Sequence, residues 1–315
     1  MKKYLTLVPA VAMLLVCGCA PKQNNSATRF MLDTVVNISA SCNYQTLNEA
    51  FELCEQYENK FSKTLNGSEV FALNMEGEGN VSPECIELIG SAQRFYNLSG
   101  GRFDVTVGAL SNIWDFKEQK VPQKMQVLTA LKGVGFDKLQ INGNFVKTNG
   151  TKLDFGGIAK GYIADKLAAF FKEQKVESAV INLGGNVVLL GEEYSNIGIK
   201  NPFKDGNIAT VRVKNKAVAT AGTYERTFSV GNEKYHHILD VSTGYPANTD
   251  VISASVICNS ATEADALSTC VVLLGAKNGL ELIEQLDFVE AIVITNNGEI
   301  KVSSGLYCEN GVYLL

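Results

Sequence analysis

The chain of 315 residues lacks several features that each mark a particular class of protein. It has no run or stripe of Lys and Arg, so binding of nucleic acid through the phosphate backbone is not expected. Its formal net charge is −5, with 28 basic residues against 33 acidic ones. It has no internal repeat and no low-complexity stretch, which disfavours an adhesive or structural surface protein.

Histidine and cysteine do not occur in the patterns that bind zinc. The only two histidines, His236 and His237, are neighbours, and no second histidine stands at metal-ligand spacing from a carboxylate or cysteine cluster. No two cysteines form a CxxC pair, so a thioredoxin-like motif is not indicated either. Most cysteines of the folded part are expected to be small buried side chains, although export would permit disulfides that the spacing does not assign. These cysteines are Cys42, Cys54, Cys85, Cys258, Cys270 and Cys308.

The N-terminus has the parts of an export signal. Lys2 and Lys3 precede an almost entirely apolar stretch at 5–16, and about a dozen residues is too short for a permanent membrane helix. A small residue stands directly before Cys19, which resembles the lipobox of bacterial lipoproteins. The resemblance implies cleavage before Cys19 and a lipid on its thiol, so residues 1–18 are interpreted as a lipoprotein signal peptide. The alternative is an ordinary secretory signal that contains cysteines.

The segment after the signal is interpreted as a lipidated cysteine and flexible tether at 19–28, because it is polar and has too little apolar content to pack. The folded domain is then expected to start near Arg29 and to span 29–315, which is long enough for a large core in one big domain or two closely joined ones. Such a protein lies in the cell envelope, lipid-anchored to a membrane and facing outside the cytoplasm.

Hydrophobic periodicity predicts a mixture of helices and strands without strict alternation. The mixture favours an α+β fold, with mostly antiparallel sheets and packed helices. Helices are expected at 47–61, 83–98, 123–131, 159–175, 261–274 and 280–286. Strands are expected at 35–40, 151–155, 179–183, 196–200, 210–213, 217–220, 227–230, 251–258, 291–295 and 300–303.

The segment 153–162 is the first candidate site. A strand at 151–155 is expected to stop at two glycines, and a helix from Ala159 follows. The free N–H groups at a helix start suit an anion such as phosphate, and glycines let a ligand approach the backbone. Lys160 lies in the first turn, where a cation is favourable only if it faces an anion. The alternative is a plain strand–turn–helix corner with an exposed lysine.

The second candidate site is the segment 260–269. Ser260 and Glu263 have the spacing of a capping box, which fixes the start of a helix. Asp265 and Thr269 are four residues apart and therefore share one helix face. A carboxylate and a hydroxyl placed in this way can present oxygens to one hard cation. The alternative is that Asp265 only interacts with the helix dipole.

The third candidate site is the segment 236–246. Asp240 follows His237 by three residues and precedes a Thr-Gly turn, so it could orient the ring or bind polar groups of a ligand. The alternative is a hairpin turn in which Asp240 bonds to local backbone. Two further polar segments, 101–108 and 222–226, could belong to a site or could be loops beside strands.

Together these segments resemble the ApbE family, the FAD:protein FMN transferases. The resemblance runs through nearly the whole folded part, and its motifs are specific because they occur in the right order. They are Asp33–Val36, Ser68–Asn74, Phe103–Gly108, Asp154–Gly161, Gly184–Asn186, Gly222–Arg226, His237–Pro246 and Asp265–Thr269.

The resemblance implies a T-fold-like α+β fold and assigns roles by position. Mg²⁺ would be held by Asp265 and Thr269, with help from main-chain oxygens at Ser268 and Gly157. His237 would accept or donate a proton or align the acceptor. His237 and Asp240 are the two candidate catalytic residues. FAD contacts would come from Leu32, Arg102, Phe103, Asp104, Asp154, Lys160 and Leu239, and Leu32 stands where the family often has Met.

The resemblance also implies a reaction. FMN would pass from FAD to a threonine hydroxyl of an exported acceptor flavoprotein, such as a subunit of a membrane redox complex, and AMP would be released in a Mg²⁺-dependent step. One alternative is a Mg²⁺-dependent FAD pyrophosphatase, in which water replaces the threonine. Another is a non-catalytic FAD-binding lipoprotein. Thr64 or Leu65 stands where some members have a tyrosine near the flavin, so the residue that stacks on the flavin is not assigned.

Overall fold

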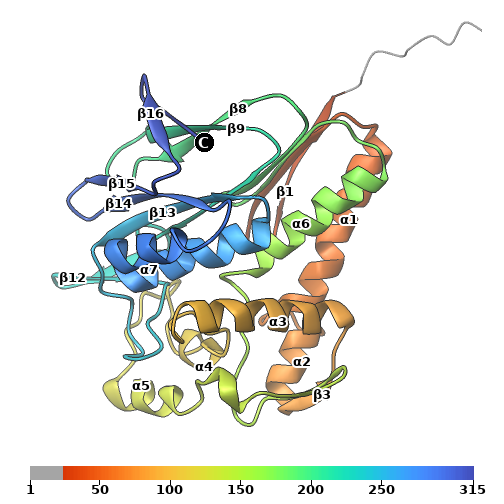
Figure 1. Cartoon of the computed structure of the whole chain (residues 1–315). Helices are drawn as coiled ribbons and strands as arrows, with labels where there is room; N and C mark the ends of the chain where they lie inside the picture. The colour runs from red at the N-terminus through yellow and green to blue at the C-terminus, as the bar shows by residue number, and fades with distance from the viewer. Residues whose placement is uncertain (1–23) are drawn as a thin grey trace, which may run out of the picture.

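The computed structural model describes residues 24–315, so the expected signal peptide and Cys19 lie outside the described residues. An eight-stranded sheet occupies the upper part of the molecule in Figure 1, and each strand is antiparallel to its neighbours. The expected α+β fold with antiparallel sheets is confirmed. In spatial order the strands are β1 (Asn25–Met31), β2 (Thr34–Ala40), β6 (Ala179–Leu183), β7 (Asn186–Leu190), β10 (Ala217–Gly222), β13 (Val251–Cys258), β14 (Glu290–Thr295) and β15 (Ile300–Val302).

Three long helices cover one face of this sheet. They are α1 (Tyr44–Phe61), α6 (Ala159–Glu173) and α7 (Ala261–Ile283). Side chains of a strand alternate between its two faces, so Ala217 and Ala219 of β10 join the core under the helices while Val218 faces the other way. The main hydrophobic core therefore lies between the sheet and these helices.

A smaller sheet covers part of the opposite face and encloses a second core that includes Val211, Val218 and Ile292. Its strands, in spatial order, are β16 (Tyr307–Glu309), β17 (Val312–Leu314), β9 (Asn207–Val213) and β8 (Ser195–Lys200). The large sheet is thus buried on both sides over much of its width.

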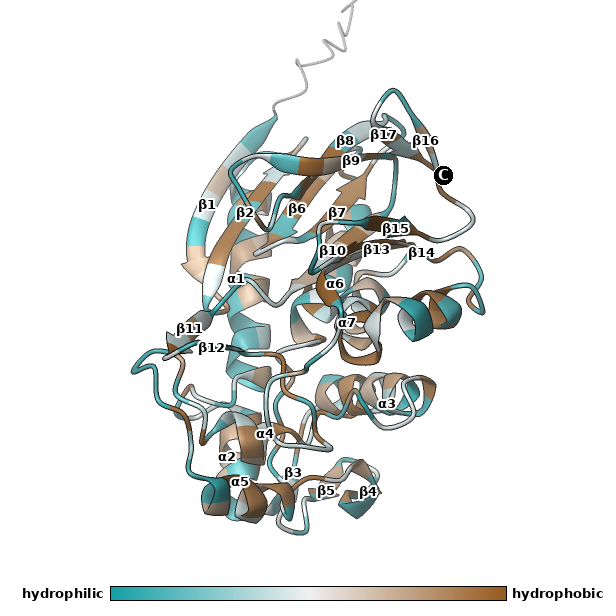
Figure 2. Ribbon diagram, turned by 90° about the vertical axis from the view of Figure 1, so that its left-hand side faces the viewer, coloured by the Kyte–Doolittle hydropathy of each residue, from teal (hydrophilic) through white to brown (hydrophobic). Residues whose placement is uncertain are grey.

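The remaining elements lie below the large sheet (Figures 1 and 2). A third core cluster includes Trp114, Val127 and Phe228, and it joins the hairpin of β11 and β12 to α4 and α5. The helices of this lower part are α2 (Glu69–Glu76), α3 (Pro83–Leu98), α4 (Gly108–Ser111), α5 (Lys124–Leu131) and the 3-10 helix Phe136–Lys138. Its strands form a sheet of β3 (Glu78–Asn80), β5 (Phe145–Lys147) and β4 (Gln140–Asn142), and a hairpin of β11 (Thr227–Val230) and β12 (Glu233–His236).

Most expected elements are present, but two expectations are wrong. The folded part starts at Asn25, before Arg29, because β1 pairs with β2 along its whole length; residues 25–28 are therefore strand and not tether. The strand expected at 151–155 is absent from the described structure except for a single bridge between Lys152 and Val107. The backbone of this segment bonds to side chains and loops instead of a neighbouring strand, as described below.

Helix α7 is long and apolar enough to cross a membrane, and it is the only such helix in residues 24–315. About two thirds of its apolar window, 67%, is buried inside the protein, where it packs on β10 and β13. Gly275, with φ 81° and ψ 167°, interrupts it, so the two helices expected at 261–274 and 280–286 follow each other across a kink. Its burial assigns α7 to the interior of the folded domain.

Candidate active site

The start of α6 packs closely against the first turns of α7. Asp265 is 5% exposed, and its Oδ2 accepts a hydrogen bond of 2.9 Å from the Gly161 N–H. A Cβ on Gly161 would lie 2.2 Å from the carbonyl oxygen of Ala261, so only glycine permits this approach. Ser260 caps α7 by accepting from the Glu263 N–H, as its spacing predicts. The capped helix and the glycine contact fix where Asp265 stands.

The residues expected to bind a metal converge at this point. A Cβ on Gly157 would lie 3.4 Å from Thr269 Oγ1, so the glycine turn before α6 touches the helix face that carries Asp265. Asp265 Oδ1 accepts no hydrogen bond from any residue in the described part of the chain. The hydroxyls of Ser268 and Thr269 both donate to the Asp265 carbonyl, over 2.8 and 3.5 Å, and their oxygens keep lone pairs that face away from this bond.

This set of donors fits magnesium. It offers a carboxylate oxygen, a hydroxyl and main-chain oxygens, which are the hard ligands that Mg²⁺ prefers. Within residues 24–315, no group of three or more His, Cys, Asp or Glu side chains could hold a metal ion. Because a single carboxylate is present, further oxygens would have to come from water or from the phosphates of a substrate, as is usual for Mg²⁺.

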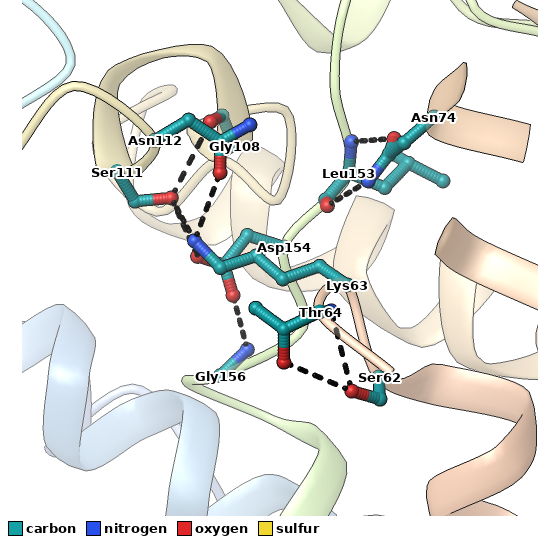
Figure 3. A network of polar contacts seen from close by, with 10 residues as sticks. All are labelled: Ser62, Lys63, Thr64, Asn74, Gly108, Ser111, Asn112, Leu153, Asp154 and Gly156. Atoms are coloured by element: carbon teal, nitrogen blue, oxygen red, sulfur yellow. Dashed lines mark hydrogen bonds and ion pairs between the residues drawn. The ribbon is translucent and has the colours of Figure 1, made fainter. Parts of the chain in front are cut away.

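Asp154 lies next to this turn, in the polar network of Figure 3. One oxygen, Oδ2, pairs with Lys63 over 2.9 Å and accepts from Ser111 Oγ over 2.7 Å. The other, Oδ1, accepts from the Gly156 N–H over 2.9 Å. Burial alone would oppose ionisation, but the Lys63 cation and these hydrogen bonds outweigh it and hold the pKa of Asp154 below its usual value. Asp154 is therefore an anion whose position ties the Gly156 turn to Lys63.

Asn74 holds the chain that leads into Asp154. Its side-chain amide donates to the Leu153 carbonyl over 2.8 Å and accepts from the Leu153 N–H over 2.7 Å, as Figure 3 shows. This paired contact replaces the strand bonding expected for 151–155. Sequence reasoning named Asn74 in a motif but assigned it no role, and it missed helix α2, which carries Asn74. Ser68 as N-cap and Gly77 as left-handed C-cap were the signal that could have found this helix.

Arg102 and Asp240, which are far apart in the chain, form an ion pair of 3.0 Å. Asp240 Oδ1 also accepts from the N–H and the hydroxyl of Ser242, over 2.8 and 2.6 Å. Asp240 makes no hydrogen bond to His237 in the described structure, so the hypothesis that it orients the histidine ring is wrong. Ser242 and Arg102 occupy the carboxylate instead, and Asp240 thereby holds the Arg102 guanidinium.

His237 is held by the chain before the β11–β12 hairpin. Its Nδ1 lies 3.2 Å from the Glu225 carbonyl. A carbonyl only accepts, so Nδ1 carries the proton in this hydrogen bond and Nε2 keeps a lone pair. The residue as a whole is exposed, yet loss of hydration around the ring and the nearby Arg226 cation lower the pKa of His237 to about 4. The ring is therefore neutral near neutral pH.

Arg226 joins His237 to the turn between β1 and β2. Its guanidinium pairs with Asp33 over 2.9 Å and donates to the Asp33 carbonyl over 2.9 Å. Leu32 and Asp33 both have positive φ, and the Leu32 N–H donates to Glu58 over 3.0 Å. Leu32 thus lies in a tight turn fixed on both sides.

The other expected FAD contacts divide into two groups. Lys160 bonds to the Gly156 carbonyl over 3.0 Å, within the same turn as Asp154, and its charge acts on His237. Phe103 is buried beside Gly157. Asp104 and Leu239 are both buried and have partners within the protein. The Asp104 carboxylate accepts from Thr106 and the Phe136 N–H, and Leu239 packs in the third core cluster.

Comparison with known proteins places these residues in a family context. The model of the ApbE family matches residues 32–293, which include every candidate site residue named above. The FAD:protein FMN transferase of Klebsiella pneumoniae (strain 342) is 33% identical over 269 residues, which cover 82% of this chain and 84% of the relative. That of Treponema pallidum (strain Nichols) is 31% identical over 291 residues, which cover 84% and 80%.

Solved structures show the same architecture. The crystal structure of the ApbE protein from Thermotoga maritima superimposes with a TM-score of 0.83 at 32% identity, over 90% of this chain and 98% of that one. The flavin transferase ApbE from Vibrio cholerae gives a TM-score of 0.80 at 25% identity, again over 90% and 98%.

Proposed function

Because the chain belongs to the ApbE family, we propose that it transfers FMN from FAD to a hydroxyl of an acceptor protein and releases AMP. The observation that carries this proposal is the convergence of Gly157, Asp265 and Thr269 beside the ionised Asp154. A storage protein for FAD has no evident need for the open oxygen of a nearly buried carboxylate. We therefore favour catalysis over simple binding of the flavin.

The metal in this proposal is Mg²⁺. Asp265 Oδ1, Thr269 Oγ1 and main-chain oxygens at Gly157 and Ser268 would hold it. When bound, the ion would neutralise charge on the FAD pyrophosphate. The Gly161 N–H keeps the other Asp265 oxygen in place, so the carboxylate is fixed before any ligand arrives.

The transfer is a substitution at the phosphorus of FMN. A threonine hydroxyl of the acceptor forms the new P–O bond, the P–O bond to AMP breaks, and the hydroxyl proton leaves. Arg102, held by Asp240, and Lys160 supply positive charge for the phosphates. His237 Nε2 has the free lone pair that could accept the proton. Because positioning and charge dominate phosphoryl transfer, these fixed groups would supply most of the rate.

The features of the N-terminus support a place for the reaction, and the family resemblance suggests the class of acceptor. We propose a lipid on Cys19, which would keep the domain at a membrane outside the cytoplasm. β1 begins only six residues after Cys19, so the folded domain would lie close to that membrane. A threonine-bearing flavoprotein of the envelope, such as a subunit of a membrane redox complex, is the expected acceptor.

The test uses the chain without residues 1–18, FAD, Mg²⁺ and an envelope flavoprotein domain that carries a candidate threonine. Intact-mass spectrometry follows the acceptor, and chromatography follows AMP and FMN. Asp265→Asn is the test variant, and Asp205→Asn, on an exposed loop, is its matched control. We expect an FMN-sized mass gain that is lost only in Asp265→Asn. Free FMN and AMP without labelling would identify a pyrophosphatase, and bound FAD without AMP would identify a carrier.

A further inference from the structure

Helix α6 and the turn before it contact α7 at three places that follow one register. On each side the contacts are spaced four residues apart, about one helical turn, and the two series run in opposite directions. The three contacts therefore lie one above another along the antiparallel pair, which is visible beside the large sheet in Figure 1. The pairs are Asp165 with Ala261, Gly161 with Asp265, and Gly157 with Thr269.

The lower two contacts belong to the proposed metal site. Gly161 contacts Asp265, and Gly157 contacts Thr269. A slide of one helix along the other by a fraction of a turn would move the Asp265 carboxylate and the Thr269 hydroxyl away from the glycine turn. The Gly161 N–H gives one hydrogen bond that favours the observed register, whereas the Gly157 contact only limits how closely the two segments approach. Further bonds between the helices are needed to hold this register firmly.

Asp165 makes the upper contact, and its carboxylate receives four hydrogen bonds from the start of α7. Oδ1 accepts from the Ala261 N–H over 2.7 Å. Oδ2 accepts from the Ser260 hydroxyl over 2.7 Å, and from the N–H and hydroxyl of Thr262 over 2.9 and 2.7 Å. Bonds to an ionised acceptor are stronger than neutral ones, and together these four leave little freedom for α7 to slide.

Capping alone does not explain this arrangement. Ser260 Oγ caps the Glu263 N–H, and Asp165 caps the N–H groups of Ala261 and Thr262. The bonds from the Ser260 and Thr262 hydroxyls to Asp165 go beyond what capping requires. The other charged side chains that line the pocket beside Asp165 pair with one another, Arg94 with Glu263 and Lys166 with Glu87. The Asp165 carboxylate is thus committed to α7 alone, from a different helix.

We propose that Asp165 is a positioning residue that sets the register of α6 and α7, so that Asp265 and Thr269 meet the Gly157 turn. The proposal rests on the magnesium site of the proposed function. It predicts that loss of the Asp165 carboxylate weakens Mg²⁺ binding although Asp165 itself would not touch the ion. An indirect effect of this kind typically weakens metal affinity by about 10- to 100-fold.

The test is a titration with Mg²⁺ at saturating FAD, in which the melting temperature of the protein is measured at each Mg²⁺ concentration. The readout is the Mg²⁺ concentration that gives half of the additional stabilisation. Asp165→Asn keeps the size of the side chain but turns one acceptor into a donor that faces the donors of Thr262 and Ser260. Ser82→Ala is the matched control, because it removes the N-cap of α3, which lies outside the metal site. The same titration is repeated with turnover as readout.

We expect the half-effect concentration to rise at least about tenfold in Asp165→Asn and to stay unchanged in Ser82→Ala. Turnover of Asp165→Asn should recover at high Mg²⁺, because its effect is on affinity. An unchanged concentration in Asp165→Asn would overturn the proposal. If Asp165→Asn does not fold, Thr262→Val, which removes one of the four donors, is tested in its place, and an unchanged concentration there has the same meaning. If Mg²⁺ gives the wild type no additional stabilisation at saturating FAD, the proposed magnesium site itself fails.

Discussion

Gly161 offers a sharp test of how closely the two site helices must approach. In Gly161→Ala the new Cβ would lie 2.2 Å from the Ala261 carbonyl oxygen and 2.7 Å from Asp265 Cβ, whereas real Cβ atoms almost never come within 3.0 Å of such atoms. The helices would have to separate by about 0.8 Å at this point. The backbone of α7 cannot yield as a flexible side chain would, so both stability and the Asp265 position should suffer.

The size of the effect can be worked out. Overpacking of this kind costs about 3 kcal/mol at the upper end of its range, and alanine returns about 1 kcal/mol of helix propensity. The net loss is about 2 kcal/mol, or about 4 to 8 °C in melting temperature for a domain of this size. Gly90→Ala is the matched control, because Gly90 also lies in a helix and its Cβ would meet nothing within 4 Å. That variant should gain up to about 1 kcal/mol.

Thermal unfolding of both variants, with and without FAD and Mg²⁺, measures these effects. Gly161→Ala should unfold earlier and should need at least about ten times more Mg²⁺ for half-maximal transfer. Gly90→Ala should unfold no earlier than the wild type and should need the same Mg²⁺. The reasoning is refuted if Gly161→Ala matches the wild type in both measurements, since the helices would then tolerate a separation that the geometry forbids.

Three further predictions concern charge and pH. Because the pKa of Asp154 is lowered, its ionised form stabilises the fold at and above the usual value of 3.8. This contribution disappears as the pH falls through the lowered pKa. In acid unfolding, Asp154→Asn should therefore be less stable than the wild type at pH 7, and its stability should decline less steeply below pH 3.8. Because the pKa of His237 is lowered to about 4, the unfolded chain takes up the proton at a higher pH than the folded protein. The stability of the fold should therefore fall as the pH drops from 6.5 to about 4. Denaturant unfolding of His237→Gln should lack this part of the decline. Asp104→Asn should lower the free energy of unfolding by about 1 to 3 kcal/mol, because the buried carboxylate accepts from Thr106 and the Phe136 N–H. Calorimetry should find its affinity for FAD nearly unchanged. A large loss of FAD affinity without a loss of stability would show that Asp104 contacts the ligand directly.

Local sequence signals were sufficient for elements that rely on their own residues. Ser82 and Pro83 mark the start of α3, and Ser260 with Glu263 marks the start of α7, because caps depend on side chains within one turn. Asp265 and Thr269 share a helix face for the same local reason. Of the six cysteines expected to be mostly buried, Cys54, Cys85, Cys258 and Cys270 are.

Contacts between distant segments could not be predicted in this way. The strand expected at 151–155 has the composition of a strand, but Asn74, nearly 80 residues away, takes the hydrogen bonds of Leu153. Lys63 and Asp165 carry no motif of their own, and their roles depend on what folds against them. Asp240 was expected to serve the nearby His237, yet it pairs with Arg102, 138 residues away.

The central claim is that one event releases AMP and labels the acceptor. The most direct measurement follows both products in the same reaction, with AMP counted by chromatography and labelled acceptor by intact mass, at saturating Mg²⁺ and FAD. We expect one AMP for each FMN-labelled acceptor, and no labelling of an acceptor whose candidate threonine is changed to valine. AMP formed at an equal rate with either acceptor, and no mass gain on the threonine form, would contradict the account.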